Sequence, residues 1–577
     1  MARMKRIIEC VPNFSEGRNK QIINDIVEAI AQTETDGERV RVLDVDPGEA
    51  TNRTVVTFVG TPEAVVEAAF QGVRKAQELI DMRQHHGAHP RSGATDVLPL
   101  IPVVGITLEE CAVLARKLAE RLYRELGIPC YCYEAAAFTP ERKNLAVCRA
   151  GEYEALPEKI ADPTRRPDFS PETWNEVAAK AGATNVGARN FLIAVNYNLN
   201  TTSTRRAMAV AFDVREKGRK AREGGSLTGK LLKDENGEQI WIPGTLKGCK
   251  AIGWYIDEYG IAQVSMNITD IAATPLHVAY EEVCRAAAAR GLKVTGVEIV
   301  GLIPKSVLID AGKFYLEKQQ RSLGIREEEI IKIAVKSMSL DDLKPFNPKE
   351  KVIEYLMEDE QELAAKHRLI RMTAEAFARE TASESAAPGG GSVSAYMGAL
   401  GAALGTMVAN LSAHKRGWDD RWKEFSDVAE QGQRIMDQLL DLVDEDTAAF
   451  NKIMDVFAMP KGTDAEKAAR AAAMEEATLY ATKVPLRTME TALQALPVCK
   501  AMAEKGNPAS ASDAGVGALA AVAGIRGAAL NVRINAAGLK DRAAAKELTD
   551  RAAELVKQAQ TAEKEILDLV NQHIDHE

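Results

Sequence analysis

Histidine is scarce in this chain of 577 residues, which contains only 8. Cysteine is equally rare: the 8 cysteines are scattered and form no Cys-x-x-Cys pair, which argues against a zinc knuckle and a disulfide framework. A surplus of basic residues is also absent, because the net charge is -10, and this excludes general nucleic-acid binding. Cysteines this dilute are typical of a reducing compartment, so we expect a cytoplasmic protein.

Long apolar runs are few. The N-terminal sequence MARMKRIIECVPNFSEG has no long apolar region behind its basic residues, so we expect no signal peptide. One uncharged stretch, residues 385–413, is long enough to span a bilayer. It is rich in Gly, Ala and Ser, which suit close contact between helices. We therefore expect a buried bundle helix and no membrane span, since no other segment has membrane character.

The length and the alternation of patterns predict a multidomain protein. Strand-like and helix-like segments alternate in the first part, which predicts two α/β (α+β sandwich-like) subdomains at residues 1–191 and 192–357. A linker at 358–366 follows, and then alanine dominates and strand signals vanish, so residues 367–577 are predicted to form an all-α helical bundle. Apolar or small residues at 548, 552, 555, 559, 562, 566 and 569 predict a final helix packed against a partner.

Three of the histidines lie in one short stretch, RQHHGAHPRSG, at residues 83–93. Gly87 and Pro90 make a continuous helix through it improbable, which disfavours a shared helical metal face. Three readings stay open: a metal site, a structural turn, and one histidine acting as a general acid or base near its ordinary pKa. Arg91 would then be a clamp for a carboxylate.

A second candidate lies in LLDLVDEDTAAFNKIM, residues 439–454. On a helical wheel Asp446 falls in the middle of an apolar face, whereas Asp444 points away and is expected to be a solvated surface acid. The apolar residues of that face are Ile435, Leu439, Leu442, Ala449, Phe450 and Ile453. A carboxyl on such a face should have a raised pKa, as acid/base sites do, although a neighbouring hydroxyl or Arg would also satisfy it.

Two further stretches are candidate anion-binding segments. Residues 214–233 hold seven basic side chains against two glutamates, and such a patch could steer an anionic ligand or simply be a solvated surface. The stretch AAPGGGSVSA precedes a small-residue helix, and its backbone N–H groups near Gly390 and Ser392 could hold an anion. Its spacing is not that of a Walker A loop, and close backbone packing is the competing explanation.

Together these segments resemble the bifunctional formimidoyltransferase-cyclodeaminase family. The matching stretches cover nearly the full length: ECVPNFSEG, LDVDPGEATNRTVVTFVG, HPRSGATDVLPLIPV, RAGEYEALP, GATNVGARNFLIAVN, GWYIDEYGIAQVS, PFNPKEKVIEYL, SAAPGGGSVSA and LVDEDTAAF. The resemblance implies transfer of a formimidoyl group from N-formimidoyl-L-glutamate to N5 of tetrahydrofolate. It also implies that the helical domain closes the product to 5,10-methenyltetrahydrofolate and releases ammonia, in histidine degradation.

The resemblance also implies site residues. The family's transferase histidine maps onto His89, and His85 matches another family histidine of less certain role. His86 and Ala88 depart from the family pattern, so neither should be essential. The family's catalytic aspartate maps onto Asp446, the residue that the helical wheel singles out. No metal is needed for either step.

Folate contacts follow from the same resemblance. Asn13 and Asp46 match family positions near the pterin. The loop from Ser170 and Pro171 to Gly182 matches the folate-contacting region but is a few residues longer here, which puts individual contacts in doubt. The basic stretch gains a plausible partner in the glutamate tail of a polyglutamylated folate.

The family assembles through dimers of the helical domain, so we expect a homo-oligomer that acts on small molecules. Three hypotheses remain. The first is the bifunctional enzyme. The second is a transferase whose helical domain only mediates oligomerisation, and the third is a folate-binding protein without turnover.

Overall fold

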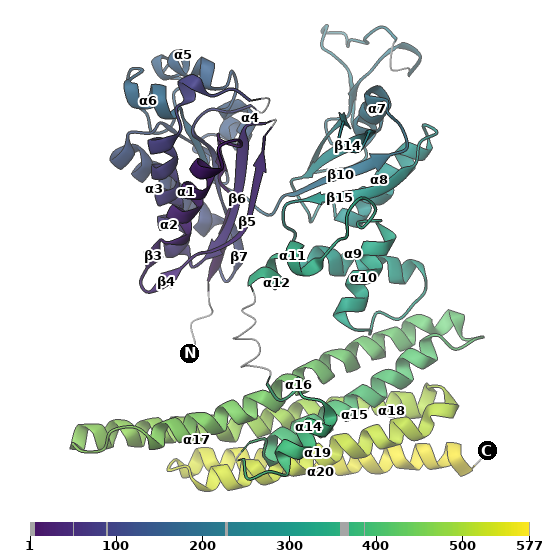
Figure 1. The fold of residues 1–577 in the computed structure, drawn as a ribbon. Helices are drawn as coiled ribbons and strands as arrows, with labels where there is room; N and C mark the ends of the chain where they lie inside the picture. The colour runs from purple at the N-terminus through teal and green to yellow at the C-terminus, as the bar shows by residue number, and fades with distance from the viewer. Residues whose placement is uncertain are drawn as a thin grey trace. The chain divides into compact units, whose positions relative to one another are not determined.

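The computed structural model describes residues 6–49, 51–87, 90–225, 229–357, 368–385 and 387–575. The chain forms two compact units: Met1–Val307 with Met338–Met357, and Leu308–Ser337 with Glu358–Glu577. Strands occur only in the first unit among the described residues, and the second is helical (Figure 1). The predicted α/β region followed by an all-α region is confirmed.

A 7-stranded sheet organises the first subdomain, in the order β1-β6-β2-β7-β9-β8, with β5 added beside β6. Its strands are β1 (Ile7–Cys10), β2 (Asn13–Phe14), β5 (Arg41–Gly48), β6 (Arg53–Gly60), β7 (Thr95–Val104), β8 (Cys130–Glu134) and β9 (Thr184–Ala188). β1 and β2 are successive pieces of one N-terminal strand, because both lie between β6 and β7 and run antiparallel to them. β9 runs parallel to both β7 and β8.

Three helices cover one face of this sheet: α1 (Lys20–Ala31), α2 (Pro62–Leu79) and α3 (Leu108–Leu126) (Figure 1). α2 begins at Pro62, directly after Thr61, and proline is favoured at the first position of a helix. Their core includes Ile8, Cys10, Phe58 and Leu100. Because side chains alternate along a strand, the neighbouring residues of the same strands occupy the opposite face of the sheet. That second face carries many of the polar residues described below.

Shorter elements complete the first subdomain. They are β3 (Glu34–Thr35), β4 (Glu38–Arg39), α4 (Leu145–Cys148), α5 (Leu156–Ala161) and α6 (Glu176–Ala181). The three helices lie in the long connection between β8 and β9. This connection packs Leu156 and Cys148 against Tyr131, Tyr133 and Val97, on the sheet face opposite α1, α2 and α3.

The second subdomain is a 4-stranded antiparallel sheet in the order β13-β14-β10-β15. Its elements are β10 (Ile193–Leu199), α7 (Thr204–Val214), β13 (Cys249–Ile256), β14 (Ile261–Ile268), α8 (Leu276–Ala288) and β15 (Val294–Val300). β13 and β14 form an antiparallel hairpin that contains the stretch GWYIDEYGIAQVS. The basic stretch after α7 is extended, with β11 (Arg219–Lys220) paired to β12 (Trp241–Ile242).

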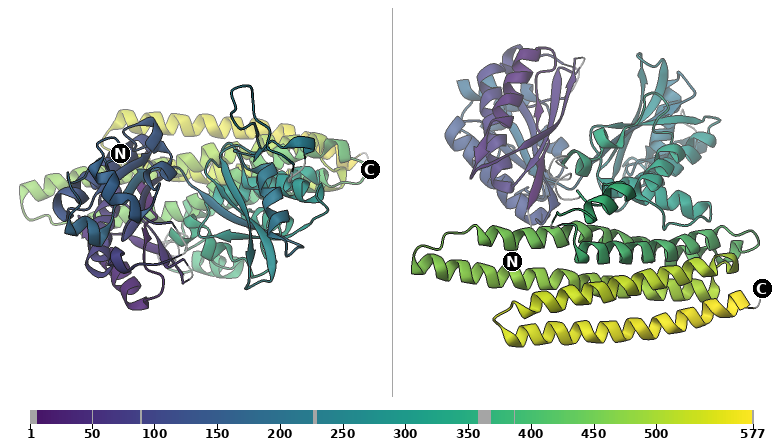
Figure 2. Two further views of the ribbon diagram at one scale, coloured as in Figure 1. Left: turned by 90° about the horizontal axis from the view of Figure 1, so that it is seen from above. Right: turned by 60° about the horizontal axis from the view of Figure 1, so that its bottom comes forward.

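The helical unit is built around α15 (Gly390–Ala413), which packs against α16 (Trp422–Phe457) and α19 (Ala511–Ala537). The other helices are α14 (Ala374–Thr381), α17 (Asp464–Leu493), α18 (Ala495–Lys505) and α20 (Arg542–Asp575), and Figure 2 shows the long helices running alongside one another. Glycine allows α15 and α19 to approach closely: a Cβ on Gly401 would lie 2.6 Å from the carbonyl oxygen of Gly517. The final helix predicted from the spacing in the tail is confirmed, since Leu555 and Ile566 are buried in the core.

Two helices are long and apolar enough to cross a membrane by length and composition alone, Gly390–Ala413 and Pro508–Ala537. Buried residues make up 61% and 56% of their most apolar windows. The first was expected from the sequence to be buried in a bundle. The expectation that no other segment has this character was wrong, because the second helix passes the same test. Both helices are apolar because each packs its small residues against the other.

One part of the α/β sequence packs with the helical unit. It comprises most of α9 (Lys305–Lys318) and all of α10 (Glu327–Ser337), whereas α11 (Pro348–Lys351) and α12 (Ile353–Met357) stay with the first unit. The turn between α9 and α10 docks through its backbone. The N–H of Leu323 donates to the hydroxyl of Ser426 over 2.9 Å, and the amide of Asn410 donates to the carbonyl of Gly324 over 2.8 Å.

Candidate functional sites

The histidine-rich loop follows α2 through a single 3₁₀ turn, Met82–Gln84. Asp81 begins the turn by accepting the N–H of Arg83 over 3.1 Å. His85 to Gly87 are not helical, as Gly87 and Pro90 predicted. Gly87 has no room for a side chain, because a Cβ there would overlap the backbone of Thr51. His89, the proposed transferase catalyst, and Ala88 lie outside the described residues.

His85 is buried and fixed at both ring nitrogens. Its Nε2 lies 2.9 Å from the carbonyl oxygen of Asn52, which can only accept, so Nε2 carries the proton. Its Nδ1 accepts from Nε of Arg91 over 3.4 Å. Burial, with the charge of Arg91 adding to it, lowers the pKa of His85. His85 is therefore a neutral residue that holds the loop, and it is poorly suited to be a base.

Asn52 joins the loop to the N-terminal strand region. Its side-chain oxygen accepts the N–H of Gly17 over 3.0 Å, and its amide donates to the carbonyl of His86 over 3.0 Å. Its φ of 49° is unusual for a residue other than glycine, and Asn tolerates this conformation better than most residues do. Asn52 lies in the stretch LDVDPGEATNRTVVTFVG, in which only Asp46 was given a role, so the sequence analysis missed the role of Asn52.

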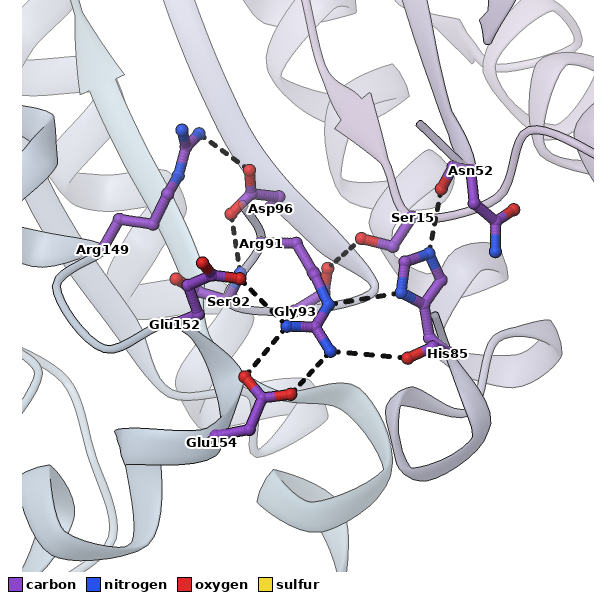
Figure 3. Close-up of polar contacts among 10 residues, drawn as sticks. All are labelled: Ser15, Asn52, His85, Arg91, Ser92, Gly93, Asp96, Arg149, Glu152 and Glu154. Carbon is purple, nitrogen blue, oxygen red and sulfur yellow. Dashed lines mark hydrogen bonds and ion pairs between the residues drawn. The ribbon is translucent and has the colours of Figure 1, made fainter. Parts of the chain in front are cut away.

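Arg91, predicted to clamp a substrate carboxylate, already binds carboxylates of this chain (Figure 3). Nη2 donates to Glu154 over 2.7 Å, and Nη1 donates to Glu154 over 2.9 Å and to Glu152 over 3.1 Å. Hydrogen bonds from Arg91 lower the pKa of Glu154. The two glutamates come from RAGEYEALP, a motif whose individual residues the sequence analysis did not interpret. Arg91 thus fixes the loop to the 149–155 segment.

A second ion pair lies beside the loop (Figure 3). Asp96 on β7 accepts the N–H of Ser92 over 2.9 Å and Nη2 of Arg149 over 2.7 Å. Burial raises the pKa of Asp96, while Arg149 and Arg53 oppose that shift. The amide of Asn185 donates to the backbone carbonyl of Asp96 over 2.8 Å. These charged residues belong to the sheet face opposite the helices and were not identified from the sequence.

The other predicted folate residues are dispersed over the same subdomain. Asn13 lies on β2 and donates to the carbonyl of Val11. Asp46 is exposed on β5, near enough to Arg53 to act on its charge. Gly182 pairs with Gly93, so it contacts the loop directly. Within the described ranges, no hydrogen bond or ion pair joins the last two predicted residues, Ser170 and Pro171, to the loop.

The second site lies in the helical unit, where Asp446 of α16 meets the first turn of α15. Its carboxylate accepts a hydrogen bond from the hydroxyl of Ser392 over 3.2 Å, and the same hydroxyl is 3.2 Å from Oγ1 of Thr447. Burial raises the pKa of Asp446, and hydrogen bonds from Ser392 only partly offset this. A Cβ on Gly391 would collide with the carboxylate, so glycine is needed there for close approach.

The pocket around Asp446 has a volume of about 120 Å³. The predicted residue Gly390 lines it, together with Asn531 and Asn535 of α19, which the sequence analysis missed. Phe450, which was assigned to the apolar face, lines the pocket but is 37% exposed. Ligand pockets for molecules of drug size span roughly 300–1,000 Å³, so the pocket of one chain is too small for a whole molecule of that size.

The expectation that Asp444 is a solvated surface acid was wrong. Asp444 is only 8% exposed and accepts the N–H groups of Leu369 over 2.8 Å and of Ile370 over 3.2 Å. These donors precede Asp444 by more than 70 positions, so a helical wheel of α16 alone gives no sign of them. Asp444 is a structural residue that fixes the start of the helical unit.

No group of three or more His, Cys, Asp or Glu side chains able to hold a metal ion is present in the described parts of the chain. Those parts include all eight cysteines, which form no disulfide, and seven of them are buried. Burial raises the pKa of Cys132 to about 12 and of Cys111 to about 11. These two thiols therefore stay protonated near neutral pH and are poor nucleophiles.

Comparisons with known proteins match both the α/β part and the helical part of the chain. Three family models match: the formiminotransferase domain, N-terminal subdomain, over residues 7–189; the formiminotransferase domain over 194–358; and formiminotransferase-cyclodeaminase over 373–554. The formimidoyltransferase-cyclodeaminase of Gallus gallus is 44% identical over 89% of this chain and 90% of its own. The glutamate formimidoyltransferase of Thermoplasma acidophilum is 41% identical over 54% of this chain and 92% of its own.

A methenyltetrahydrofolate cyclohydrolase of Methylorubrum extorquens is 39% identical over 26% of this chain and 71% of its own. The similarity to the Gallus gallus protein is different in kind, because it runs through both the α/β part and the helical part. The chain therefore belongs to the formimidoyltransferase-cyclodeaminase family.

Proposed function

We propose that this chain transfers the formimidoyl group of N-formimidoyl-L-glutamate to N5 of tetrahydrofolate and then cyclises the product. The observation that carries the proposal is the pairing of two sites in one chain. The first is a histidine loop pinned through His85 and Arg91, and the second is a carboxyl of raised pKa at Asp446. Relatives with both halves have the name of a bifunctional enzyme, and a relative matching about half the chain has the name of a transferase alone.

In the transfer step N5 attacks the amidine carbon and forms a tetrahedral intermediate. A base takes the N5 proton, and an acid protonates the departing glutamate nitrogen, and one imidazole can perform both in sequence. We assign this role to His89. His85 cannot share it, because its Nε2 proton is committed to Asn52 and burial lowers its pKa.

In the cyclisation N10 attacks the same carbon and ammonia leaves. We assign the proton transfers to Asp446, whose pKa burial raises, as suits a carboxyl that both holds and releases a proton. The pairing of Asp446 with Ser392 sets the direction of its carboxylate. A helical domain that only mediates oligomerisation has no use for such a carboxyl, which favours the bifunctional enzyme over that alternative.

We also propose a homo-oligomer built from dimers of the helical unit. Large apolar side chains are exposed close to the Asp446 pocket: Leu530 is 63% exposed and Ile534 is 72% exposed on α19. They adjoin Asn531 and Asn535, which line the pocket. A second copy seated on this surface would bury apolar area and enlarge the pocket at the same time.

The folate is proposed to be polyglutamylated and the enzyme cytoplasmic. A groove of about 520 Å³ on the second subdomain is lined by Arg215, Lys217 and Lys250. Lys217 belongs to the basic stretch predicted to bind the tail, and a chain of glutamates is the small polyanion that such a groove suits. The eight cysteines form no disulfide, which supports a reducing compartment.

The decisive experiment gives the purified chain both substrates and follows the absorbance of methenyltetrahydrofolate. His89→Ala is expected to abolish transfer while cyclisation of supplied 5-formimidoyltetrahydrofolate persists, and Asp446→Asn is expected to do the reverse. A wild-type chain that binds folate but forms no product would instead support a folate-binding protein without turnover.

A further inference from the structure

Arg91 was expected to bind a carboxylate of the substrate, but its contacts indicate that another residue binds this group. Both terminal nitrogens of Arg91 bind Glu154, one also binds Glu152, and Nε faces His85. Arg91 is only 8% exposed. A substrate carboxylate would have to displace an internal one to reach it, with no net gain in ion pairing.

Arg149 is different, because part of its hydrogen-bonding capacity is unused. Nη2 binds Asp96 over 2.7 Å, but Nε is buried with no hydrogen-bond partner in the described structure. The same is true of Oγ of Ser92 and Oδ1 of Asn185, both of which belong to residues bonded to Asp96. Buried polar atoms without partners are uncommon in folded proteins, and a cluster of them beside one ion pair indicates a place for a ligand.

The charges around Asp96 also favour an anion. Two guanidinium groups, those of Arg149 and Arg53, act on the single buried carboxylate of Asp96. Arg53 is half-buried, and desolvation lowers its pKa, as expected of a cation that has lost part of its hydration. Asp46, the other acid that acts on Arg53, is exposed on β5. A second carboxylate brought by a substrate would balance the pair of arginines.

We infer that Arg149, with Arg53 beside it, receives the α-carboxylate of the formimidoyl donor and thereby sets the specificity of the transferase site. This inference rests on the proposed function. Asp96 accepts both the N–H of Ser92 and Nη2 of Arg149, which holds Arg149 beside the histidine loop, and Arg91 binds Glu152 and Glu154 of the segment that carries Arg149. Arg149 is thus a binding residue, and Asp96 positions it.

The location selects the donor rather than the folate. In N-formimidoyl-L-glutamate the α-carboxylate is attached to the carbon next to the departing nitrogen, so it must lie close to the reacting centre. The carboxylates of a folate lie beyond the aminobenzoyl group, far from N5. Arg149 binds Asp96, which also accepts the N–H of Ser92, three positions after His89. This cation is therefore placed for the donor's α-carboxylate.

The test crosses one enzyme change with one substrate change. The wild-type full chain and Arg149→Gln are each assayed with N-formimidoyl-L-glutamate and with N-formimidoyl-γ-aminobutyrate, which lacks the α-carboxylate. Wild type is expected to lose roughly 10- to 100-fold in kcat/KM with the analogue, as for a hydrogen bond to a charged group. Arg149→Gln should have a similarly low kcat/KM with both donors. Its KM for tetrahydrofolate should stay within roughly twofold of wild type.

Two controls guard against a folding defect. Arg142→Gln breaks another half-buried pair of the same subdomain, with Asp168, and should keep the wild-type preference between donors even where it lowers the melting temperature. Arg149→Lys retains a cation but not the Nε donor, so it should show an intermediate preference.

Three outcomes would overturn the inference. In the first, Arg149→Gln still discriminates between the two donors as strongly as wild type does. In the second, the variant raises the KM for tetrahydrofolate instead. In the third, Arg149→Gln loses the discrimination between N-formimidoyl-L-glutamate and N-formimidoyl-α-aminobutyrate, which lacks only the side-chain carboxylate. A wild-type chain inactive with N-formimidoyl-L-glutamate would contradict the proposed function itself, which keeps the two failures distinct.

Discussion

The imidazole of His85 donates from Nε2 to the backbone carbonyl of Asn52 over 2.9 Å, and the side chain of Asn52 donates in turn to the carbonyl of His86. His85→Ala should therefore release the loop and lower the transfer rate roughly tenfold, since small displacements of catalytic groups are costly. The acidic limb of the pH–rate profile should not move, because the proposed base is His89 and burial already lowers the pKa of His85. Transfer assays from about pH 5.5 to about pH 8.5 measure this, and a vanished limb would make His85 the base.

Asp446→Asn should stabilise the protein while it abolishes cyclisation. Burial raises the pKa of Asp446, so the folded state holds this proton more tightly than the unfolded chain does. The resulting stabilisation is present below the ordinary aspartate pKa of about 4 and is lost as the pH rises through the raised value. Asn carries no charge to bury at this position, so the free energy of unfolding at neutral pH should be higher for the variant than for wild type. Urea titrations at neutral pH of the two proteins decide the sign.

Asp444→Ala should have the opposite effect on stability. It leaves the N–H groups of Leu369 and Ile370 without their acceptor, at a cost of about 1–3 kcal/mol for buried groups. The same urea titration applies, with Asp446→Asn as the matched variant two residues away. Equal stability of Asp444→Ala and wild type would show that Asp444 does not hold this segment.

Ile534→Asp should weaken self-association, because it places a charge on the apolar surface proposed to form the dimer contact. Ile534 is 72% exposed in the single chain. Light scattering after size-exclusion chromatography should show a smaller species. Cyclisation should fall with it, while transfer should persist. Ile574→Asp serves as a control, since Ile574 is also exposed but lies near the end of α20. An unchanged mass for Ile534→Asp would place the contact elsewhere.

Lys217→Glu should raise the KM for polyglutamylated tetrahydrofolate more than for the monoglutamate. The change reverses a charge in the groove that Arg215 and Lys250 also line. The preference of wild type for the longer tail should weaken at high salt, as expected for an exposed electrostatic contact. Lys564→Glu in the helical unit, outside this groove, is the charge-matched control. A KM that rises equally for both folates would remove the groove from tail binding.

The sequence predicts local structure well wherever that structure depends on the residues of a single helix or strand. The start of α2 at Pro62 follows from its Thr-Pro sequence, and the place of Asp446 follows from the periodicity of α16. Asp444 shows the limit of that reasoning, since its partners Leu369 and Ile370 are joined to it only by the fold. Periodicity describes one helix, whereas burial depends on everything packed against it.

Arg91 shows a second limit, which concerns charge. An arginine two positions from the proposed catalytic histidine suggests a residue that binds a substrate carboxylate. Arg91 instead binds Glu152 and Glu154, which lie about 60 positions further along the chain. Positive φ at Asn52 and at Glu152 is likewise set by the surrounding fold rather than by local propensity. The motifs therefore indicated the loop, and only the three-dimensional contacts showed that Arg91 is bound to Glu152 and Glu154.

The turn between α9 and α10 places the boundary between the two units at a different point from the boundary expected from the sequence. By sequence it belongs to the α/β half, yet its backbone amides at Ser322 and Leu323 are satisfied by His414 and Ser426 of the helical unit. A cut after residue 357 would leave those amides and the buried Leu323 facing water, and the helical fragment would lose the segment that covers α15 and α16. The two activities are thus joined by shared packing as well as by a covalent link, and separating them as independent proteins requires redesign of this turn.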